Sequence, residues 1–400
     1  MAKALFLSLP LTGHVNPSLG LVHELARRGD DVAYYATEGF AEAIERAGAH
    51  FRQYSAAPLA DLRHLPERTN ELSSWLVETA GRVLEADLAA FRALRPDYVI
   101  TDSVAPWGQW AAAILGVPLV TSISTIAFNH HVMRYAFGRG VRPRHAGRLA
   151  TKLRHVGRAW WLRRRLARRY GVAGPGVFGA VMGSSDLNIV YTSRRFQPCA
   201  ETFDSRFQFI GPLVQRSETT FAWDRLRPSA EVIYVSLGTL FNRNVAFYRA
   251  CVEAFADGPE QVVVSTGSTA AVAELGQLPA NIIAAAYVPQ LAVLQRAAAF
   301  VTHGGMNSVS ESLSCAVPMV VVPQMSEQAI VGRRVEELGA GLYLAAESVT
   351  AATLRSAVRR LQAEDRFRTA AAEIRQSFRD AGGAVRAADA IHRFLAVPAS

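Results

Sequence analysis

Cysteine is scarce in this chain of 400 residues: there are three, at positions 199, 251 and 315. An odd number at such wide spacing predicts neither a disulfide framework nor a metal knuckle. We therefore expect free thiols and a cytoplasmic location, where thiols stay reduced.

Long apolar runs are also lacking, because no stretch approaches the roughly 18–20 residues that span a bilayer. The N-terminal MAKALFLSLPLTGHV has a lysine and a short apolar run but no small-x-small cleavage site. We interpret it as a first strand rather than a signal peptide. Half of the residues are hydrophobic and only 19% are charged, which favours two or three domains with substantial cores.

Two nucleotide-binding motifs are missing. No G-x-G-x-x-G follows a first strand in either half, and no G-x-x-x-x-G-K-[ST] occurs. The sequence therefore lacks a dinucleotide fingerprint and the P-loop of phosphoryl transfer. None of the ten histidines forms an H-E-x-x-H motif, and the carboxylates do not cluster at metal-ligand spacing. We expect no required metal and no bound cofactor.

Acidic residues are absent from 103 to 185, a window that contains 13 arginines and lysines. Subtracting these 13 from the net charge of +9 leaves −4 for the rest of the chain, so the basicity is local. It is densest at 142–171, where Trp160 and Trp161 lie among arginines. This segment fits a solvated helix, an acceptor-binding lobe or a weak contact with an anionic membrane surface. Nucleic acid is not an expected partner.

Apolar runs alternate with segments of helical length from end to end, which predicts βαβ units and mainly parallel sheets. Asn16 and Pro17 are the expected N-cap and first position of the first helix. Residues 130–185 break the rhythm and favour helices or loops, and 211–231 is the best linker candidate. The predicted strands are 4–9, 31–37, 97–101 and 117–123 in the first half, then 232–236, 261–265, 281–287, 299–303 and 317–323 in the second.

Each predicted strand of the second half is followed by a loop of polar or small residues. Ligands of open α/β sheets bind beyond the carboxyl ends of the strands, so these loops favour a nucleotide-type site, although ordinary turns share this composition. In FVTHGGMNSVSESL (300–313), two glycines precede a helix N-terminus, a combination that suits phosphate. Glu311 has two interpretations: it closes a capping box with Ser308, or it holds a ribose diol.

In the first half, His14 follows the first predicted strand and Asp102 follows the strand 97–101. Parallel strands bring both residues to one sheet edge, where a histidine backed by a carboxylate forms an oriented general base. The alternative is a loop histidine and an N-cap aspartate that never meet. Apolar and aromatic residues around 104–140 favour a hydrophobic acceptor.

Together these residues resemble the family-one nucleotide-sugar-dependent glycosyltransferases of the GT-B fold. The similarity is greatest to the bacterial macrolide and natural-product branch. It covers essentially the whole chain, from GHVNP (13–17) to the last helix, and is strongest in YVPQ (287–290), THGGMNS (302–308) and EQ (327–328). Plant members have tryptophan where Tyr287 and Met306 stand, and aspartate where Glu327 stands. These departures leave the base and the sugar open.

The resemblance implies two Rossmann-like domains whose parallel sheets face each other across a cleft. The expected boundaries are 1–212 for an acceptor domain, 213–230 for a linker, 231–383 for a donor domain and 384–400 for a helix that crosses back to the first domain. It implies His14 as catalytic base, Asp102 as its partner, and Ser124 near the sugar. Trp107 and Phe128, within the apolar and aromatic stretch 104–140, are expected near the acceptor. The implied donor-binding residues are Ser236, Gly238, Thr239, Tyr287, Val288, Gln290, His303, Gly305, Asn307, Ser308, Glu311, Glu327 and Gln328.

The implied reaction is inverting, metal-independent transfer of a hexose from a UDP- or dTDP-sugar to a hydroxyl of a hydrophobic small molecule. Two alternatives stay open at this point. One is an epimerase or hydrolase of the same fold that acts on the nucleotide sugar itself. The other is a non-catalytic protein that binds a nucleotide sugar or a membrane surface.

Overall fold

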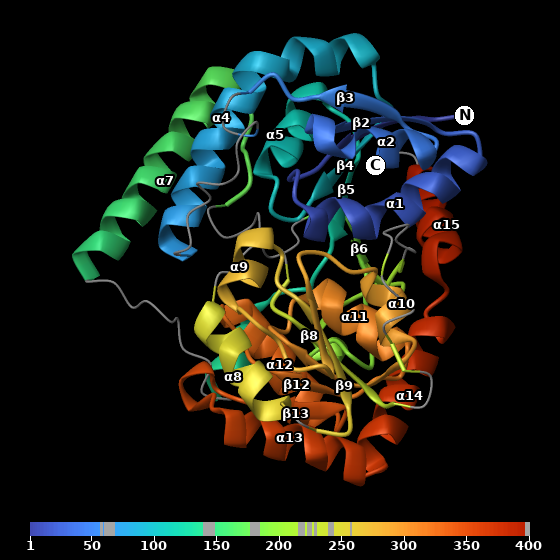
Figure 1. The fold of residues 1–400 in the computed structure, drawn as a ribbon. Helices are drawn as coiled ribbons and strands as arrows, with labels where there is room; N and C mark the ends of the chain where they lie inside the picture. The colour runs from blue at the N-terminus through green and yellow to red at the C-terminus, as the bar shows by residue number, and fades with distance from the viewer. Residues whose placement is uncertain are drawn as a thin grey trace. The chain divides into compact units, whose positions relative to one another are not determined.

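The computed structural model describes residues 1–56, 59, 69–138, 149–176, 185–214, 221, 226–227, 230–238, 244–256 and 258–396. The chain forms two compact units. The first comprises residues 1–135, 143–213 and 381–400, and the second comprises 136–142 and 214–380. Each unit contains one parallel sheet, so the α/β prediction is confirmed (Figure 1). No helix in the described ranges has the length and apolarity to cross a bilayer.

The sheet of the first unit has the order β3-β2-β1-β4-β5-β6-β7, and every neighbouring pair is parallel. Side chains of its central strands alternate between two buried cores: Ala4 and Phe6 face one, Leu5 and Leu7 the other. The strands are β1 (Lys3–Leu7), β2 (Asp31–Ala36), β3 (His50–Gln53), β4 (Tyr98–Asp102), β5 (Leu119–Ile123), β6 (Leu187–Val190) and β7 (Phe207–Phe209).

Helices cover both faces of this sheet. The core on one face includes residues of α1 and α15, and that on the other includes residues of α4, α5 and α7. Figure 1 shows α7 lying along α4, and α15 beside α1. The helices are α1 (Thr12–Arg27), α2 (Ala41–Arg46), α4 (Thr69–Leu94), α5 (Pro106–Leu115), α6 (His130–Gly138), α7 (Leu149–Tyr170) and α15 (Gly383–Ala396), with short 3₁₀ turns η1 (Glu38–Phe40) and η3 (Ala200–Thr202).

The last helix, α15, packs against the rest of the first unit through its apolar face and also through polar contacts. The Arg28 guanidinium donates to Asp389 at 2.6 Å, and His392 Nε2 lies 2.9 Å from Asp30 Oδ2. Ala387 and Ile391 are buried in the same core as Val22 of α1. The C-terminal helix therefore belongs to the fold of the N-terminal sheet.

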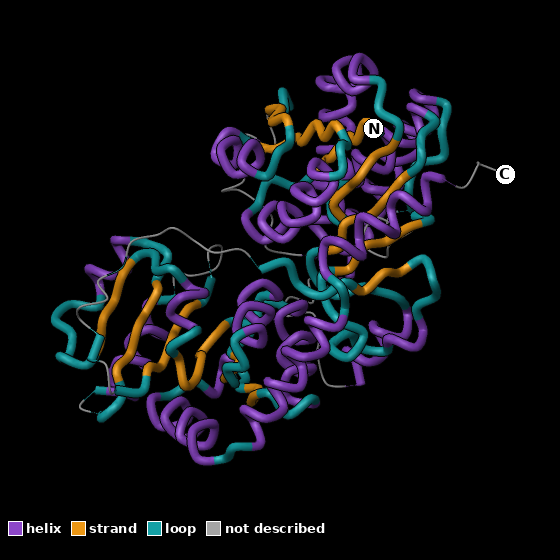
Figure 2. Tube along the Cα trace, turned by 90° about the vertical axis from the view of Figure 1, so that its right-hand side faces the viewer, coloured by secondary structure: helices purple, strands orange, loops and turns teal. Residues whose placement is uncertain are grey.

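The sheet of the second unit has the order β10-β9-β8-β11-β12-β13, again with parallel neighbours only. Figure 2 shows strands of this unit side by side, with helices beside them. Its strands are β8 (Val232–Ser236), β9 (Gln261–Ser265), β10 (Ile282–Ala285), β11 (Ala297–Thr302), β12 (Met319–Val321) and β13 (Gly341–Tyr343). Its helices are α8 (Val245–Phe255), α9 (Thr269–Glu274), α10 (Gln290–Leu294), α11 (Met306–Ser314), α12 (Ser326–Glu337), α13 (Ala351–Ala363) and α14 (Arg366–Asp380), with the turn η5 (Ala346–Ser348).

All nine predicted strands exist, but four further strands among the described residues were not foreseen: β3, β6, β7 and β13. The predicted start of the first helix is wrong. The N–H groups of His14 and Val15 both donate to Leu11 O at 2.9 Å, so winding begins at Thr12 and Pro17 lies inside the helix. His14 therefore lies in the first turn of α1 rather than in a loop.

Candidate active site

His14 and Asp102 meet at the carboxyl edge of the first sheet. β1 and β4 are neighbours, with Leu7 paired to Thr101, so the start of α1 comes close to the end of β4. His14 Nδ1 lies 2.8 Å from Asp102 Oδ2, and the side chains are 18% and 1% exposed, respectively. The alternative in which the two residues never meet is therefore wrong.

The hydrogen bonds around Asp102 determine which nitrogen of His14 can accept a proton. Asp102 Oδ1 accepts from the backbone N–H of Val104 at 2.8 Å, which fixes the carboxylate at the strand end. An ionised carboxylate can only accept hydrogen bonds, so the Nδ1 atom of the neutral ring carries the hydrogen and donates it. The basic lone pair is then on Nε2.

Ser124 is a second neighbour of the same ring nitrogen. Its Oγ lies 3.1 Å from His14 Nδ1, and the side chain is buried. Register explains the placement, because Asp102 pairs with Ser122 and Ser124 follows two residues later, past the end of β5. Ser124 therefore contacts the base-bearing ring, whereas the resemblance implied only a position near the sugar.

The aromatic residues expected near the acceptor divide into two groups. Trp107 is fully buried, and its Nε1 donates to Tyr54 Oη at 3.0 Å inside the core beneath α5. Trp107 is therefore a core residue, and the expectation that it contacts the acceptor is wrong. Phe128 is half-buried, and Phe137 on α6 is exposed. The latter two retain surface that an apolar ligand could contact.

In the second unit, the ring of His303 lies between two glycines. Thr302 at the end of β11 pairs with Ser236 at the end of β8, which brings His303 beside Gly238. A Cβ on Gly238 would come within 2.7 Å of the His303 Nε2 atom, and a Cβ on Gly305 would approach that atom even more closely. Gly238 also has a φ of +79°, which few residues other than glycine adopt. These glycines make room for the imidazole.

The His303 ring is held neutral. Desolvation by the surrounding protein lowers its pKa to about 4, and a hydrogen bond with the Ser236 backbone opposes this only in part. Directly after it, α11 begins at Met306 with Gly305 as N-cap, so Asn307 and Ser308 lie in the first helical turn. An unprotonated ring beside the N–H groups of a helix start provides donors without a formal positive charge.

Glu311 belongs to a polar network on the same helix. Gln290 Nε2 donates to Glu311 Oε2 at 2.8 Å and to Ser308 Oγ at 3.3 Å, and Tyr234 Oη donates to Gln290 Oε1 at 3.1 Å. Burial raises the pKa of Glu311 to about 7, and the hydrogen bond from Gln290 lowers it less. The helix begins before Ser308, whose side chain does not cap it, so the capping-box interpretation is wrong.

The remaining donor-site predictions lie on strand ends and loops of the second unit. Tyr287 is 63% exposed while Val288 is buried, and both lie between β10 and α10. Glu327 lies in the first turn of α12. Gln328 Oε1 accepts from the backbone N–H of Gln324 at 2.8 Å, so its carbonyl caps that helix. Thr239 lies outside the described residues.

Comparison with known proteins identifies the family to which this chain belongs. Residues 252–381 match the family described as "Erythromycin biosynthesis protein CIII-like, C-terminal domain". NDP-glycosyltransferase YjiC of Bacillus licheniformis is 35% identical over 97% of this chain and 96% of its own length. The chain belongs to the nucleotide-sugar-dependent glycosyltransferases of the GT-B fold. The resemblance predicted from the motifs is thereby confirmed.

Relatives from natural-product pathways align over nearly the whole chain of this glycosyltransferase. Demethyllactenocin mycarosyltransferase of Streptomyces fradiae is 33% identical over 99% of this chain and 87% of its own. The crystal structure of CalG4, a calicheamicin glycosyltransferase, is 35% identical over 100% of both chains, with a TM-score of 0.81. The glycotransferase of kitacinnamycin is 31% identical over 98% of this chain and 99% of its own, with a TM-score of 0.84.

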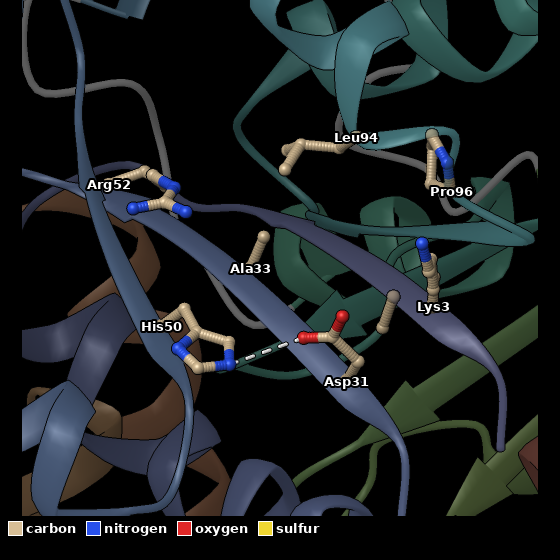
Figure 3. A pocket seen from close by; sticks show the side chains of 8 residues that line it. Lys3, Asp31, Ala33, His50, Arg52, Leu94 and Pro96 are labelled. Atoms are coloured by element: carbon tan, nitrogen blue, oxygen red, sulfur yellow. Dashed lines mark ion pairs between the residues drawn. The ribbon is translucent and has the colours of Figure 1, made fainter.

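A small surface cavity of about 190 Å³ lies elsewhere in the first unit of this glycosyltransferase. Lys3, Asp31 and His50, the first residues of β1, β2 and β3, are among the residues that line it (Figure 3). His50 Nε2 and Asp31 Oδ1 are 3.4 Å apart across it. Because this is the amino edge of the sheet, the cavity is not the site of His14 and Asp102.

One residue of the candidate site, and one contact between two predicted residues, were not foreseen from the sequence. Tyr234 lies within the apolar strand 232–236, where a tyrosine is typical of a core, yet its hydroxyl orients Gln290. The close approach of Gly238 to His303 joins two loops 65 positions apart. Only the pairing of β8 with β11 brings these loops together, and no local pattern encodes that pairing.

Gly305→Ala is expected to destabilise the second unit by about 1–3 kcal/mol, because the new methyl group would overlap the His303 ring. The φ of Gly305 is −62°, so the backbone itself tolerates alanine and the cost arises from the ring alone. Thermal unfolding of the single variants and of Gly305→Ala/His303→Ala measures it, and the double variant should recover most of the loss. Gly39→Ala, where no atom lies within 4 Å of the added Cβ, is the control. Equal melting temperatures for Gly305→Ala and Gly39→Ala would contradict the packing described here.

Proposed function

We propose that this glycosyltransferase moves a hexose from a UDP- or dTDP-linked sugar to a hydroxyl group of a hydrophobic small molecule, with inversion at the anomeric carbon and without a metal ion. His14 is the general base. The observation that carries the proposal is the 2.8 Å contact between His14 Nδ1 and the buried Asp102 carboxylate. A non-catalytic binding protein, one of the alternatives above, has no use for a paired base, and the family assignment favours transfer over epimerisation or hydrolysis.

In the proposed reaction, His14 Nε2 takes the proton of the acceptor hydroxyl as its oxygen attacks the anomeric carbon. The new carbon–oxygen bond forms while the bond to the diphosphate breaks, and the nucleoside diphosphate leaves with the electron pair. A single displacement inverts the centre, so an α-linked donor gives a β-linked product. Asp102 holds the ring in the productive tautomer and stabilises the imidazolium that forms.

The diphosphate is assigned to the start of α11 and to His303. The N–H groups of a helix start and the positive end of the helix dipole stabilise developing negative charge. The low pKa of His303, about 4, keeps its ring neutral, so it acts as a hydrogen-bond donor rather than as a cation. Glu311 and Gln290 are assigned to the ribose and base end, with Tyr287 and Val288 beside the base and Glu327 and Gln328 near the sugar.

The proposed acceptor is a natural product with an apolar body. This rests on half-buried Phe128 in the first unit, and on relatives whose names specify such products, among them the oleandomycin glycosyltransferase of Streptomyces antibioticus at 30% identity. We also propose a cytoplasmic location, because Cys199, Cys251 and Cys315 are free thiols.

The test is a time course of nucleoside diphosphate release from UDP-glucose and from dTDP-glucose, with and without a mixed set of phenolic and macrolide acceptors. EDTA is present throughout, and mass spectrometry follows the acceptors. We expect acceptor-dependent release with a hexose-sized gain in mass, and the anomeric proton coupling of the product then reports inversion. Release that does not need an acceptor would replace transfer with hydrolysis or epimerisation. Loss of activity in EDTA, restored by a divalent cation, would overturn the metal-independent mechanism.

A further inference from the structure

Helix α7 carries the basic segment, and one side of the helix, its inner side, packs against α4. Ala159 and Leu166 are buried, and Leu166 belongs to the core cluster that includes Val83 of α4. At the borders of this contact, Arg158 donates to Glu78 at 2.7 Å and Arg169 to Glu85 at 3.2 Å. Glu78 and Glu85 of α4 are thus engaged by the arginines that flank the buried stripe.

The opposite side, which we call the outer face of α7, is cationic and aromatic. Its spacing of three, four and seven residues brings the members to one side of the helix. None of its arginines has a carboxylate partner in the described part of the chain. The outer face consists of Arg154, Trp160, Trp161, Arg164, Arg165 and Arg168, all exposed.

The two tryptophans of the outer face are unusually accessible, at 50% and 55% exposed. The Arg164 guanidinium lies 5.2 Å from the ring centre of Trp160, and that of Arg165 lies 5.7 Å from the ring centre of Trp161. Indole rings exposed beside guanidinium groups combine an apolar surface with positive charge. Exposure of this surface to water alone is unfavourable, because the apolar rings remain hydrated.

We propose that the outer face of α7 binds the headgroup region of an anionic lipid bilayer. Arginine attracts lipid phosphate, and tryptophan prefers the boundary between headgroups and acyl chains, so one surface of this composition meets both requirements. A second copy of this chain is a poor occupant, because two such faces would repel each other. Nucleic acid could bind the arginines. It would not explain why two indole rings are exposed beside them on a helix whose other side is buried.

The experiment is co-sedimentation of the full chain with phosphatidylcholine vesicles, with and without phosphatidylglycerol, at low and at physiological salt. Binding should require phosphatidylglycerol and weaken with salt. Arg164→Gln/Arg165→Gln/Arg168→Gln should reduce partitioning by about tenfold or more. Trp160→Ser/Trp161→Ser should also reduce it and should abolish quenching of tryptophan fluorescence by brominated lipid. These side chains are exposed and form no ion pair with any residue that the structure describes, so the variants should fold, and thermal unfolding checks this.

Arg46→Gln/Arg206→Gln/Arg366→Gln is the matched control, since it removes the same charge from exposed sites elsewhere. The control should bind vesicles as the unmodified chain does. Equal weakening in both triple variants would overturn the proposal, because net charge alone would then explain binding. Absence of vesicle binding under all conditions would also overturn it, as would binding to duplex DNA in preference to anionic vesicles.

Discussion

His14→Ala is expected to lower kcat by about 10²–10⁴-fold and to leave donor affinity nearly unchanged. The alanine variant lacks the Nε2 atom that would take the proton of the acceptor, whereas the side chains that we assign to the donor lie in the other unit. Steady-state kinetics with an aliphatic alcohol acceptor gives kcat, and titration calorimetry gives the Kd of the donor. The acid limb of the pH profile of kcat, measured at saturating donor so that donor binding does not contribute, reports protonation of the base and should disappear in the variant.

An acidic phenol is the matched control acceptor for this prediction. It ionises without help, so the loss caused by His14→Ala should be much smaller with the phenol than with the alcohol. Intact turnover of the alcohol by the variant would remove His14 from the mechanism.

Asp102→Asn tests the positioning of the ring separately from its presence. The asparagine amide can donate to Nδ1 and so favour the wrong tautomer, which should lower kcat without removing the imidazole. In the His14→Ala background the same change should have little further effect, because the two residues act as one unit. Ser124→Ala, at the same ring nitrogen, is expected to cost less, since Asp102 remains.

The periodicity of apolar runs was sufficient to predict two parallel sheets, because buried parallel strands are almost continuously apolar. Two of the strands that escaped prediction lack that signal. β3 has the sequence HFRQ at a sheet edge and is largely exposed, and β13 at the edge of the other sheet has only three residues, Gly341–Tyr343. Both are specified by pairing with a neighbour rather than by their own composition.

The prediction that His14 and Asp102 lie together was confirmed because it used topology: residues after neighbouring parallel strands must come together. Local patterns were less reliable. Asn16-Pro17 is typical of a helix start, yet the turn at Leu11 begins α1 earlier. The spacing of Ser308 and Glu311 fits a capping box, yet Gly305 takes the N-cap position and moves both residues into the helix. Local rules compete with contacts that no short window contains.

The role of Trp107 could not be predicted from residue type. Tryptophan is equally suitable for a core and for an apolar binding surface, and only the tertiary structure places its Nε1 against Tyr54 inside the sheet–helix core. The same ambiguity applied to Ser124, whose hydroxyl could face a ligand or a neighbouring ring. Burial decides both cases, and burial depends on which elements pack together.

Glu311→Ala is expected to weaken donor binding by roughly 10–100-fold, because a carboxylate that accepts hydrogen bonds from a ribose diol contributes more than a neutral group. The pKa of about 7 adds a pH dependence: donor affinity should rise as the pH increases through 7 and Glu311 ionises. The donor Kd measured by calorimetry between pH 5.5 and 8, values chosen to bracket that pKa, checks this. Unchanged affinity in Glu311→Ala would contradict the ribose assignment.

Glu311→Gln is expected to change the pH dependence of stability in the absence of donor. The carboxyl pKa is about 7 in the fold against 4.5 when unperturbed, so the folded state holds the proton more tightly. The protein therefore loses stability as the pH rises from about 4.5 to 7, by about 2 kcal/mol once some solvent access is allowed for. Glutamine removes this loss.

Thermal unfolding of the unmodified chain and of Glu311→Gln, compared at each pH, isolates the effect of this carboxyl. Burial of neutral His303 has the opposite pH dependence, with stability lost as the pH falls from 6.5 towards 4, but it acts on both proteins and cancels in the difference. The difference in melting temperature should be smallest near pH 4.5 and should favour glutamine above pH 7. Glu253→Gln, at an exposed carboxylate on α8, is the control for the loss of one carboxylate elsewhere in the same unit. A difference between Glu311→Gln and the unmodified chain that does not change with pH would mean that Glu311 is hydrated in the fold, and the network with Gln290 would then hold an ordinary carboxylate.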